Sequence, residues 1–431
     1  MLRAQSLSPL AAAALGICVV LGAATYTAHA SQSAALGGWP PPLDLSQSGG
    51  SDSKDPDLAL LQNGDLHVIW MEPRGVTSTL FSTLHHAKSR DRGANWTYSQ
   101  PLTPKGQDRF QPAMDADEYG VLHVVWVEGK TLGQLRYTSL PGGNWGEPEE
   151  ITSTTSAMVS PDVVVATDTV HAVWSQMVPG PSGSQTDVFH SWSEAGGAWS
   201  PATATVETRF SSWSPRVAED PSGNLHLVWE EDATPEEILY ISGTVYASGT
   251  VWSMTTTVSA ELSQAAITPD VAVGSDYRVH VVFGAYVDGQ TDVQEIYHAA
   301  FQANDPGAVS PTLIPGSRVT VSHQLPKFAS PAVALFGDDQ VHVAWNGWKE
   351  ADYQDANRIY YAVSEDGGVS WSWPVPASPR DTEPDGFACL AADAQYVHLV
   401  WQEKASSTDE DIYYARRFPV RMPLPLGLKE F

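Results

Sequence analysis

Short runs in which apolar and polar residues alternate occur along most of the chain, and one of these runs is repeated. Residues 63–70 read NGDLHVIW, and residues 120–126 read GVLHVVW. An alternation with a period of two residues is typical of a β-strand with one buried face. The run recurs around seven histidines spaced 48 to 62 residues apart, namely His67, His123, His171, His226, His280, His342 and His398. A repeat of this length indicates an array of similar small units.

Each repeat contains four strand-like segments. The first opens with an X-Pro step, at Pro56, Pro112, Pro161, Pro215, Pro269, Pro331 and Pro384. The second carries the histidine, followed after three residues by Trp, or by Phe283 in one repeat. The third is an aromatic run, such as residues 359–362, and the fourth begins near a Trp, as in residues 96–102. Four short strands in each of seven repeats, with no helical period, predict an all-β β-propeller.

The two ends of the chain favour closure of the ring. The seventh repeat ends after its third strand, at Ala415, and residues 39–45 read WPPPLDL, like a spare fourth strand. Pairing this segment with the last blade would remove two exposed sheet edges. We therefore expect one propeller domain over residues 31–420, with seven four-stranded antiparallel blades closed by an N-terminal strand. Six blades are the alternative.

Composition and charge narrow the range of partners. The chain has 431 residues, of which 34 are Gly and 31 are Pro, and its 50 acidic and 23 basic residues give a net charge of −27. Frequent Gly and Pro oppose long helices. A strongly acidic surface repels phosphate backbones and anionic membrane surfaces, so we expect no nucleic-acid partner.

The first 30 residues have the pattern of a signal peptide. Arg3 is their only charge, an apolar stretch extends from Leu10 to about Ala24, and residues 28–30 read AHA, as at a signal-peptidase site. An uncleaved anchor is the alternative, and residues 15–18 depart from a lipoprotein box at Ile17. We expect export after cleavage near Ala30, no membrane span in the mature chain, a secreted or periplasmic location, and a C-terminal tail at residues 421–431. Cys389 then remains alone, without an internal disulfide.

An octet of the form Ser-x-Asp-x-Gly-x-x-Trp occurs twice between a third and a fourth strand. Its members are Ser89, Asp91, Gly93 and Trp96 in one copy and Ser364, Asp366, Gly368 and Trp371 in the other. In such a turn Asp accepts amide hydrogen bonds, Gly supplies a positive φ and Trp packs between neighbouring sheets. The octet is the Asp-box, and with the repeats it makes the mature chain resemble the sialidase-like Asp-box (BNR-repeat) propellers.

The resemblance implies a fold rather than an activity. In that family the Asp-box is a structural turn on the side away from the active site. The family's sialidases have six blades and use an arginine triad, an Asp acid and a Tyr nucleophile with a Glu partner. The first arginine usually lies in an Arg-Ile-Pro or Arg-Leu-Pro motif, which this sequence lacks. No catalytic residue is therefore carried over.

Candidate site residues are those that depart from the repeat. The seven histidines recur in every blade, so we expect them to be structural. The loops after second strands carry Glu72, Glu128 and Glu231, which form either a solvated acidic rim or a carboxylate-ringed mouth for sugar hydroxyls or Ca²⁺. Trp213 and Trp348 should lie on the same loop face, where aromatic rings stack on sugars or cap blade edges, and Arg216 replaces an Asp seen in other repeats.

Two classes of function remain open. The favoured one is a non-catalytic exported module that binds an extracellular glycan or protein on its loop face, because no nucleophile and base stand together in a motif. The alternative is a sialidase-like glycoside hydrolase that uses paired carboxylates such as Glu231 with Glu72 or Glu128. No cofactor is expected, although Ca²⁺ is possible, and the sequence does not assign a metal site or an oligomeric state.

Overall fold

The structure is a computed structural model that describes residues 38–418 apart from 49–51, 75–80, 99–100, 104–108, 130–132, 181–182, 195–196, 207, 288, 308, 321–328, 348–356, 380–382 and 407–408. The expected signal peptide at residues 1–30 and the tail at residues 421–431 lie outside the described residues, as does Trp348. Within the described part, no helix is long and apolar enough to cross a membrane.

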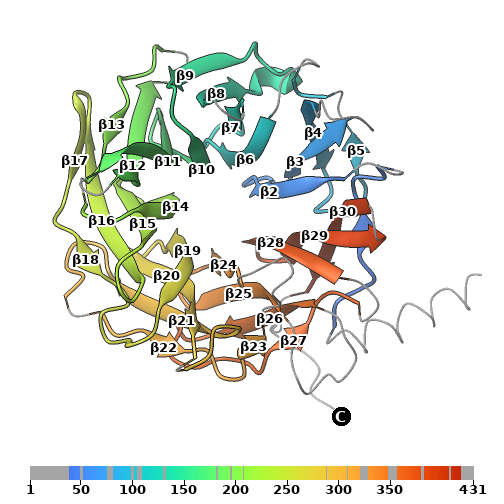
Figure 1. The fold of residues 1–431 in the computed structure, drawn as a ribbon. Helices are drawn as coiled ribbons and strands as arrows, with labels where there is room; N and C mark the ends of the chain where they lie inside the picture. The colour runs from blue at the N-terminus through green and yellow to red at the C-terminus, as the bar shows by residue number, and fades with distance from the viewer. Residues whose placement is uncertain are drawn as a thin grey trace, which may run out of the picture.

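Seven antiparallel sheets are arranged around a common centre, as predicted from the seven repeats (Figure 1). Blade 1 consists of β2 (Lys54–Leu60), β3 (Leu66–Arg74), β4 (Phe81–Ser89) and β5 (Thr97–Tyr98). Blade 2 consists of β6 (Arg109–Ala116), β7 (Leu122–Glu128), β8 (Gln134–Ser139) and β9 (Glu149–Ser153). Blade 3 consists of β10 (Met158–Ala166), β11 (Thr169–Gly180), β12 (Gly183–Glu194) and β13 (Thr203–Ala204). A 3₁₀ turn, Pro141–Gly143, follows β8.

Blades 4 to 7 repeat this order with small additions. Blade 4 consists of β14 (Ser212–Glu219), β15 (Leu225–Glu231), β16 (Glu237–Tyr246), β17 (Gly249–Trp252) and β18 (Thr256–Thr257), and blade 5 of β19 (Ala266–Val273), β20 (Arg278–Tyr286), β21 (Val293–Gln302), β22 (Thr312–Leu313) and β23 (Val319–Thr320). Blade 6 consists of β24 (Ala332–Phe336), β25 (Gln340–Gly347), β26 (Arg358–Ser364) and β27 (Val375–Pro376). Blade 7 contains β28 (Glu383–Ala392), β29 (Val397–Ser406) and β30 (Asp409–Arg417). Several outer strands are shorter than the sequence pattern suggests, β5 having two residues.

The N-terminal segment closes the ring, as expected. Its strand β1 (Leu43–Asp44) pairs antiparallel with β30, with Leu43 opposite Tyr414 and Asp44 opposite Tyr413. The amide of Leu45 continues the ladder by donating to the carbonyl of Ile412 at 2.7 Å. Blade 7 is therefore built from both ends of the chain, with β1 as its outermost strand.

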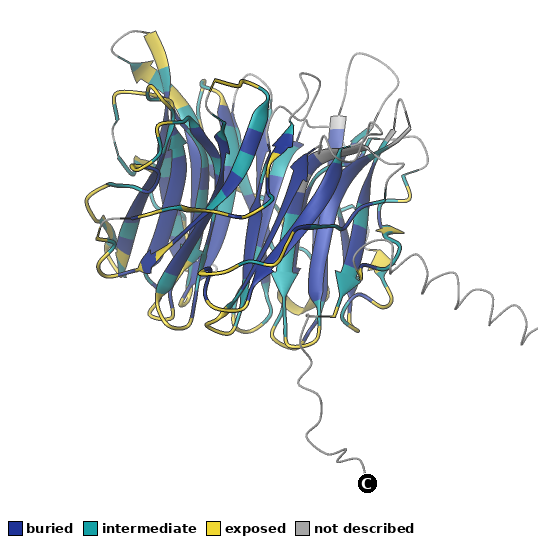
Figure 2. Cartoon of the chain, turned by 90° about the horizontal axis from the view of Figure 1, so that it is seen from below, coloured by how far each residue is buried: buried dark blue, intermediate teal, exposed yellow. Residues whose placement is uncertain are grey.

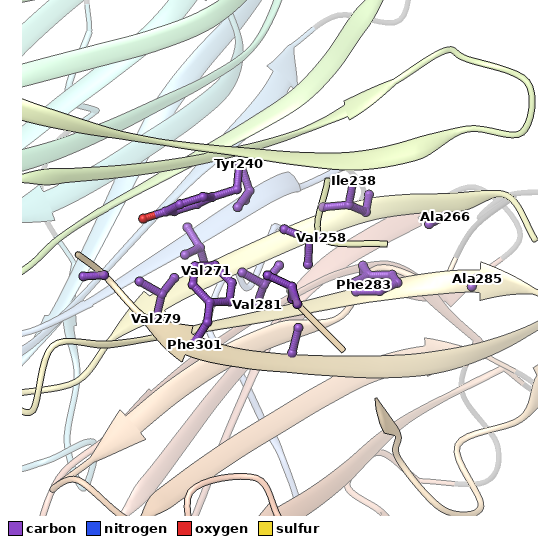
Figure 3. Close-up of a cluster of buried hydrophobic side chains, with 14 residues drawn as sticks. Ile238, Tyr240, Val258, Ala266, Val271, Val279, Val281, Phe283, Ala285 and Phe301 are labelled. Atoms are coloured by element: carbon purple, nitrogen blue, oxygen red, sulfur yellow. The ribbon is translucent and has the colours of Figure 1, made fainter. Parts of the chain in front are cut away.

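The core lies between neighbouring blades rather than at the centre of the ring. Figure 3 shows one such layer, in which Ile238 and Tyr240 of blade 4 face Val281 and Phe283 of blade 5. In the side view of Figure 2, the buried residues fill the middle of the blades and the exposed residues lie at their ends. Burial of these apolar side chains between sheets is the main term that stabilises the ring.

Every junction between blades carries an edge-to-face aromatic pair with ring centroids 4.8 to 5.4 Å apart. Going round the ring, the pairs are Trp96–Tyr414, Trp145–His86, Trp199–Tyr137, Trp252–His190, Phe301–Tyr240, Trp371–His298 and Trp39–Tyr361. Edge-to-face contacts are a favoured geometry of aromatic rings. One aromatic clamp thus joins each blade to the blade before it.

The repeat histidines support these clamps from within each blade. Each is hydrogen-bonded to the clamp residue of its own blade, in the pairs His67–His86, His123–Tyr137, His171–His190, His226–Tyr240, His280–His298, His342–Tyr361 and His398–Tyr414. Burial lowers the pKa of His67 to about 4 and that of His86 to about 3, so both are neutral at pH 7. The structural role expected for the histidines is confirmed.

The two Asp-box turns have the same hydrogen bonds. In blade 1 the hydroxyl of Ser89 donates to Asp91 Oδ1 at 2.8 Å, and the amides of Gly93 and Asn95 donate to Ser89 Oγ and Asp91 Oδ1, each at 2.8 Å. In blade 6 Ser364, Asp366 and Gly368 repeat these contacts. A side chain at Gly93 would overlap the ring of Tyr414, so this glycine also allows the clamp to form.

Candidate functional site

The first strands of the seven blades surround a central cavity. It has a volume of about 640 Å³ and is lined by β2, β6, β10, β14, β19 and residues at the start of blades 6 and 7. The inner edge of each sheet faces this cavity, so backbone amides there need partners other than a neighbouring strand. Small ligands bind preferentially in concave sites, so this cavity is the place where a ligand is expected.

The strand register places one residue of each blade in a ring around the cavity. Each ring residue lies opposite the residue that follows the repeat histidine by two positions. In blade order the ring is Asp57, Ala113, Asp162, Arg216, Asp270, Ala332 and Cys389. Three of the seven side chains are therefore carboxyl groups, one is a guanidinium, one is a thiol and two are the methyl groups of alanine.

The aspartates of the ring join neighbouring blades. Asp57 accepts the amide of Leu58 in its own strand at 2.8 Å and that of Met114 in the next blade at 2.6 Å. Asp162 binds Val163 and Val217 in the same way, at 3.0 and 2.9 Å. Each carboxylate thus serves two inner-edge amides and keeps unused acceptor positions toward the cavity.

The pKa values of the ring carboxyls are raised. Burial, together with the charge of Asp162, raises the pKa of Asp57 to about 7. Burial also raises the pKa of Asp162 to about 6, against the opposing effect of the Arg216 guanidinium. At neutral pH the ring therefore holds less negative charge than its composition suggests.

Arg216 is the only cation of this ring, and its guanidinium is largely uncommitted. Nη1 donates to the carbonyl of Pro215 at 2.9 Å, which is its one hydrogen bond within the described residues. Guanidinium has five N–H donors, so the others are available to water or a ligand in the cavity. Cys389, by contrast, donates its thiol to the carbonyl of Pro56 at 3.0 Å, and burial raises its pKa well above the usual value.

One mouth of the cavity is ringed by residues with a positive φ. Asp55, Gln111, Ser160, Ser214 and Thr268 each precede the repeat proline and have φ between 50° and 52°. In each case a side-chain oxygen of one blade accepts a hydrogen bond from a backbone amide of the next blade. The Gln402 side chain accepts the amide of Asp55 at 3.1 Å, that of Asp55 accepts the amide of Gln111 at 3.3 Å, and that of Gln111 accepts the amide of Ser160 at 2.8 Å. These inter-blade bonds hold a backbone conformation that non-glycine residues seldom adopt.

Blade 4 contributes a glutamate to this mouth. Glu230 lies opposite Trp213 in the pair β14–β15 and accepts the amide of Thr268 in blade 5 at 3.0 Å. Burial raises the pKa of Glu230 to about 7, and the charges of Glu236 and Asp232 add to this effect. Trp213 is half-buried and belongs to none of the hydrophobic clusters of the core. Trp213, Arg216 and Glu230 thus come from one strand pair beside the cavity.

The predicted glutamates have other surroundings. Glu72, Glu128 and Glu231 are buried, with exposed fractions of 8%, 8% and 3%. Glu231 accepts the indole N–H of Trp229 at 3.1 Å and the hydroxyl of Ser212 at 2.8 Å. Glu128 pairs with Arg109 at 3.2 Å, and Glu72 pairs with His85 at 2.6 Å. The interpretation of these residues as a solvated acidic rim is wrong.

The repeat pattern in the sequence distinguishes Glu231, which belongs to it, from Glu230, which does not. A Trp-x-Glu pattern occurs in four repeats, at Glu72, Glu128, Glu231 and Glu403, so it belongs to the template. Glu230 has no acidic counterpart at its register position in the other blades, where Met71, Val127, Ser175, Gly284, Asn346 and Gln402 stand. Glu230 is therefore the functional candidate that the analysis of the sequence missed. Among the described residues, no group of three or more His, Cys, Asp or Glu side chains is arranged to hold a metal ion.

A scan against protein-family models gave no match, and neither did a search of curated protein sequences. Solved structures do resemble the fold. A protein of unknown function from Dyadobacter fermentans aligns with a TM-score of 0.50 and 11% identity over 88% of this chain and 98% of that one. The endosialidase of phage phi92 aligns with a TM-score of 0.52 and 10% identity over 89% of this chain and 69% of that one. The protein therefore has the fold of the sialidase-type β-propellers, and identities this low show the fold alone.

Proposed function

We propose that this protein is an exported propeller of the Asp-box type that binds a carbohydrate at the mouth of its central cavity. The observation that carries this proposal is that the strand pair β14–β15 bears Trp213 opposite Glu230 together with Arg216, which lines that cavity. An aromatic face, a cation with free N–H donors and a carboxyl group are the combination that sugar binding uses. The signal-peptide pattern of residues 1–30 supports an extracytoplasmic location.

The chemistry of the cavity suits hydroxyl groups. The ring aspartates retain acceptor positions, and Arg216 supplies donors, so the wall offers both donors and acceptors of hydrogen bonds. The indole of Trp213 would stack on the apolar face of a sugar ring. The whole protein's negative charge makes a neutral glycan the better partner than a polyanion at this site.

A hydrolytic function is the second candidate. The pairing predicted from the sequence, Glu231 with Glu72 or Glu128, has little support because all three side chains are buried and bonded to neighbours. Glu230 is a better general acid, since its pKa of about 7 keeps much of it protonated near neutral pH. Glu236, whose charge acts on Glu230, is the carboxylate that would complete such a pair.

A glycan array probed with the mature protein, with Ca²⁺ and with a chelator, tests the binding function. We expect binding that Trp213→Ala weakens by about 1–3 kcal/mol if the ring is a stacked anchor. Trp373→Ala is the matched control because Trp373 is 72% exposed and lies in blade 6. Equal binding by the wild type and Trp213→Ala would show that the glycan does not bind beside Trp213 at the mouth of the cavity.

Turnover of aryl-glycosides separates binding from hydrolysis. Glu230→Gln keeps an acceptor for the amide of Thr268 but cannot donate a titratable proton. Turnover that is present in the wild type and absent from a folded Glu230→Gln variant would establish the hydrolase. Binding without turnover in either protein supports the recognition module.

A further inference from the structure

A second cavity lies away from the channel, at the Asp-box turn of blade 1. It has a volume of about 400 Å³ and is lined by Lys88, Arg90, Asp91, Asn95 and Thr97. The residues come from the end of β4, from the turn that follows and from β5, where Thr97 lies opposite Lys88. The lining contains two cations and one carboxylate, which makes it locally basic in a chain of net charge −27.

Neither cation has a partner among the described residues. Lys88 and Arg90 take part in no ion pair there, whereas Lys54 pairs with Glu410 at 2.9 Å, Arg92 with Asp393 at 2.8 Å and Arg318 with Glu295 at 2.8 Å. With 50 acidic residues in the chain, acidic partners are abundant. Two neighbouring cations that remain unpaired at a cavity are therefore available to an outside anion.

The carboxylate of the cavity is committed to the turn. Asp91 accepts the hydroxyl of Ser89 and the amide of Asn95 through Oδ1, and the side-chain amide of Asn95 through Oδ2 at 2.7 Å. These bonds, that of the Asn95 side chain first, lower the pKa of Asp91 to about 2. Its oxygens thus face donors of the turn. The Asn95 amide has a second N–H that this turn does not use.

The other Asp-box shows that folding does not require these cations. In blade 6 the octet makes the same bonds, with Ser364 donating to Asp366 and the amide of Ser370 donating to Asp366 Oδ1. Val363 and Glu365 stand there at the positions of Lys88 and Arg90. The same turn therefore forms with an apolar residue and an acidic residue at these two places.

We propose that the cavity beside the blade 1 Asp-box binds a sulfate or phosphate group. Lys88 supplies a point charge, Arg90 supplies a planar fork of N–H donors, and Asn95 supplies one further N–H. Tetrahedral oxyanions match this set because they accept several hydrogen bonds and carry the opposite charge. This site is separate from the glycan site proposed at the channel, and the two can fail independently.

Retention of the mature protein on immobilised dextran sulfate and on phosphocellulose at low ionic strength tests the proposal, with unsulfated dextran as the blank. Elution by inorganic sulfate or phosphate measures whether the free ion competes. The variants are Arg90→Gln and the double change Lys88→Gln with Arg90→Gln. Arg209→Gln is the matched control because Arg209 is also an exposed cation without an ion-pair partner among the described residues, in the segment between β13 and β14.

We expect the wild type to be retained and the double variant to bind about tenfold more weakly, which corresponds to the loss of about 1.4 kcal/mol. Arg209→Gln should bind like the wild type, and all proteins should melt at similar temperatures because blade 6 carries Glu365 at this place. Retention on one matrix only would identify the ester, sulfate or phosphate. No retention of the wild type, or equal retention of the double variant, would overturn the proposal.

Discussion

The indole ring of Trp96 meets the phenol ring of Tyr414 edge to face, with centroids 4.8 Å apart and an interplanar angle of 70°. Trp96 belongs to blade 1 and Tyr414 to blade 7, so the contact joins the first blade to the last. His398 is hydrogen-bonded to the hydroxyl of Tyr414 at 2.8 Å from the other side. The ring is thus closed by an aromatic clamp as well as by the strand pairing of β1.

Trp39 is the clamp residue that the N-terminal segment supplies. It is fully buried and meets Tyr361 at 5.4 Å. Trp39→Ala should therefore lower the free energy of unfolding by about 3–5 kcal/mol, as loss of a buried aromatic side chain does. Urea unfolding followed by tryptophan fluorescence measures the change. Trp373→Ala, which removes an exposed indole, should change stability by less than about 0.5 kcal/mol.

Gly93 tests the Asp-box turn. It has a φ of 77°, and a Cβ there would overlap the hydroxyl of Tyr414. Gly289 has a nearly equal φ of 75° with nothing near the position of a Cβ. Gly289→Ala should cost about 1–2 kcal/mol for the left-handed backbone alone. Gly93→Ala should cost more, because it also displaces the clamp, and equal melting temperatures for the two variants would contradict this account.

The buried histidine pairs should make the fold sensitive to acid. Burial lowers the pKa of His67 to about 4 and that of His86 to about 3, while unfolded histidine titrates near 6.5. Between these values the unfolded chain binds more protons, so the free energy of unfolding falls as pH decreases below about 6.5. The slope is up to about 1.4 kcal/mol per pH unit for each neutral histidine.

His86→Tyr isolates this effect. Tyrosine already occupies the clamp position in four blades, at Tyr137, Tyr240, Tyr361 and Tyr414, where it bonds to the repeat histidine. The variant should therefore fold, and it should lose less stability than the wild type between pH 6.5 and 4. Chemical denaturation at several pH values measures both slopes. Parallel profiles would show that His86 does not titrate on unfolding.

Asp57 should have the opposite pH dependence. Its pKa is raised to about 7 in the fold, chiefly by burial, from the ordinary value of 3.8. The folded state binds the proton more tightly between these values, so the contribution of Asp57 to stability is lost as pH rises toward 7. Asp57→Asn removes this titration. The stability of the variant relative to the wild type should increase from pH 5 to pH 8, and a constant difference would contradict the raised pKa.

The repeat pattern was sufficient to predict the architecture. Alternation around His67 and its six counterparts defined the second strands, and the short N-terminal run at Leu43 supplied the missing strand of blade 7. These features depend on local sequence and on the need to bury one face of each strand. The octets at Asp91 and Asp366 likewise form turns whose bonds lie within a few residues.

One member of the ring around the cavity, that of blade 7, could not be predicted in the same way. In six blades the ring residue directly follows the repeat proline, as Asp57 follows Pro56. That rule would place Asp385 in the ring of blade 7, but two register shifts after Pro384 bring Cys389 there instead. Bulges depend on how a strand meets its neighbours, which a single sequence does not state.

The ring around the cavity has seven positions, an odd number, and its aspartates occupy every second position from Asp57 to Asp270. Asp57, Asp162 and Asp270 each serve an amide in their own blade and one in the next, so three residues supply six blades. Strict alternation cannot close on seven members, and the unmatched position falls on Cys389 in the blade made from both chain ends. Because the number of blades is odd, the alternation is interrupted in blade 7, where the two ends of the chain meet. An eighth blade, together with an aspartate in place of Cys389, would allow aspartates to alternate around the whole ring.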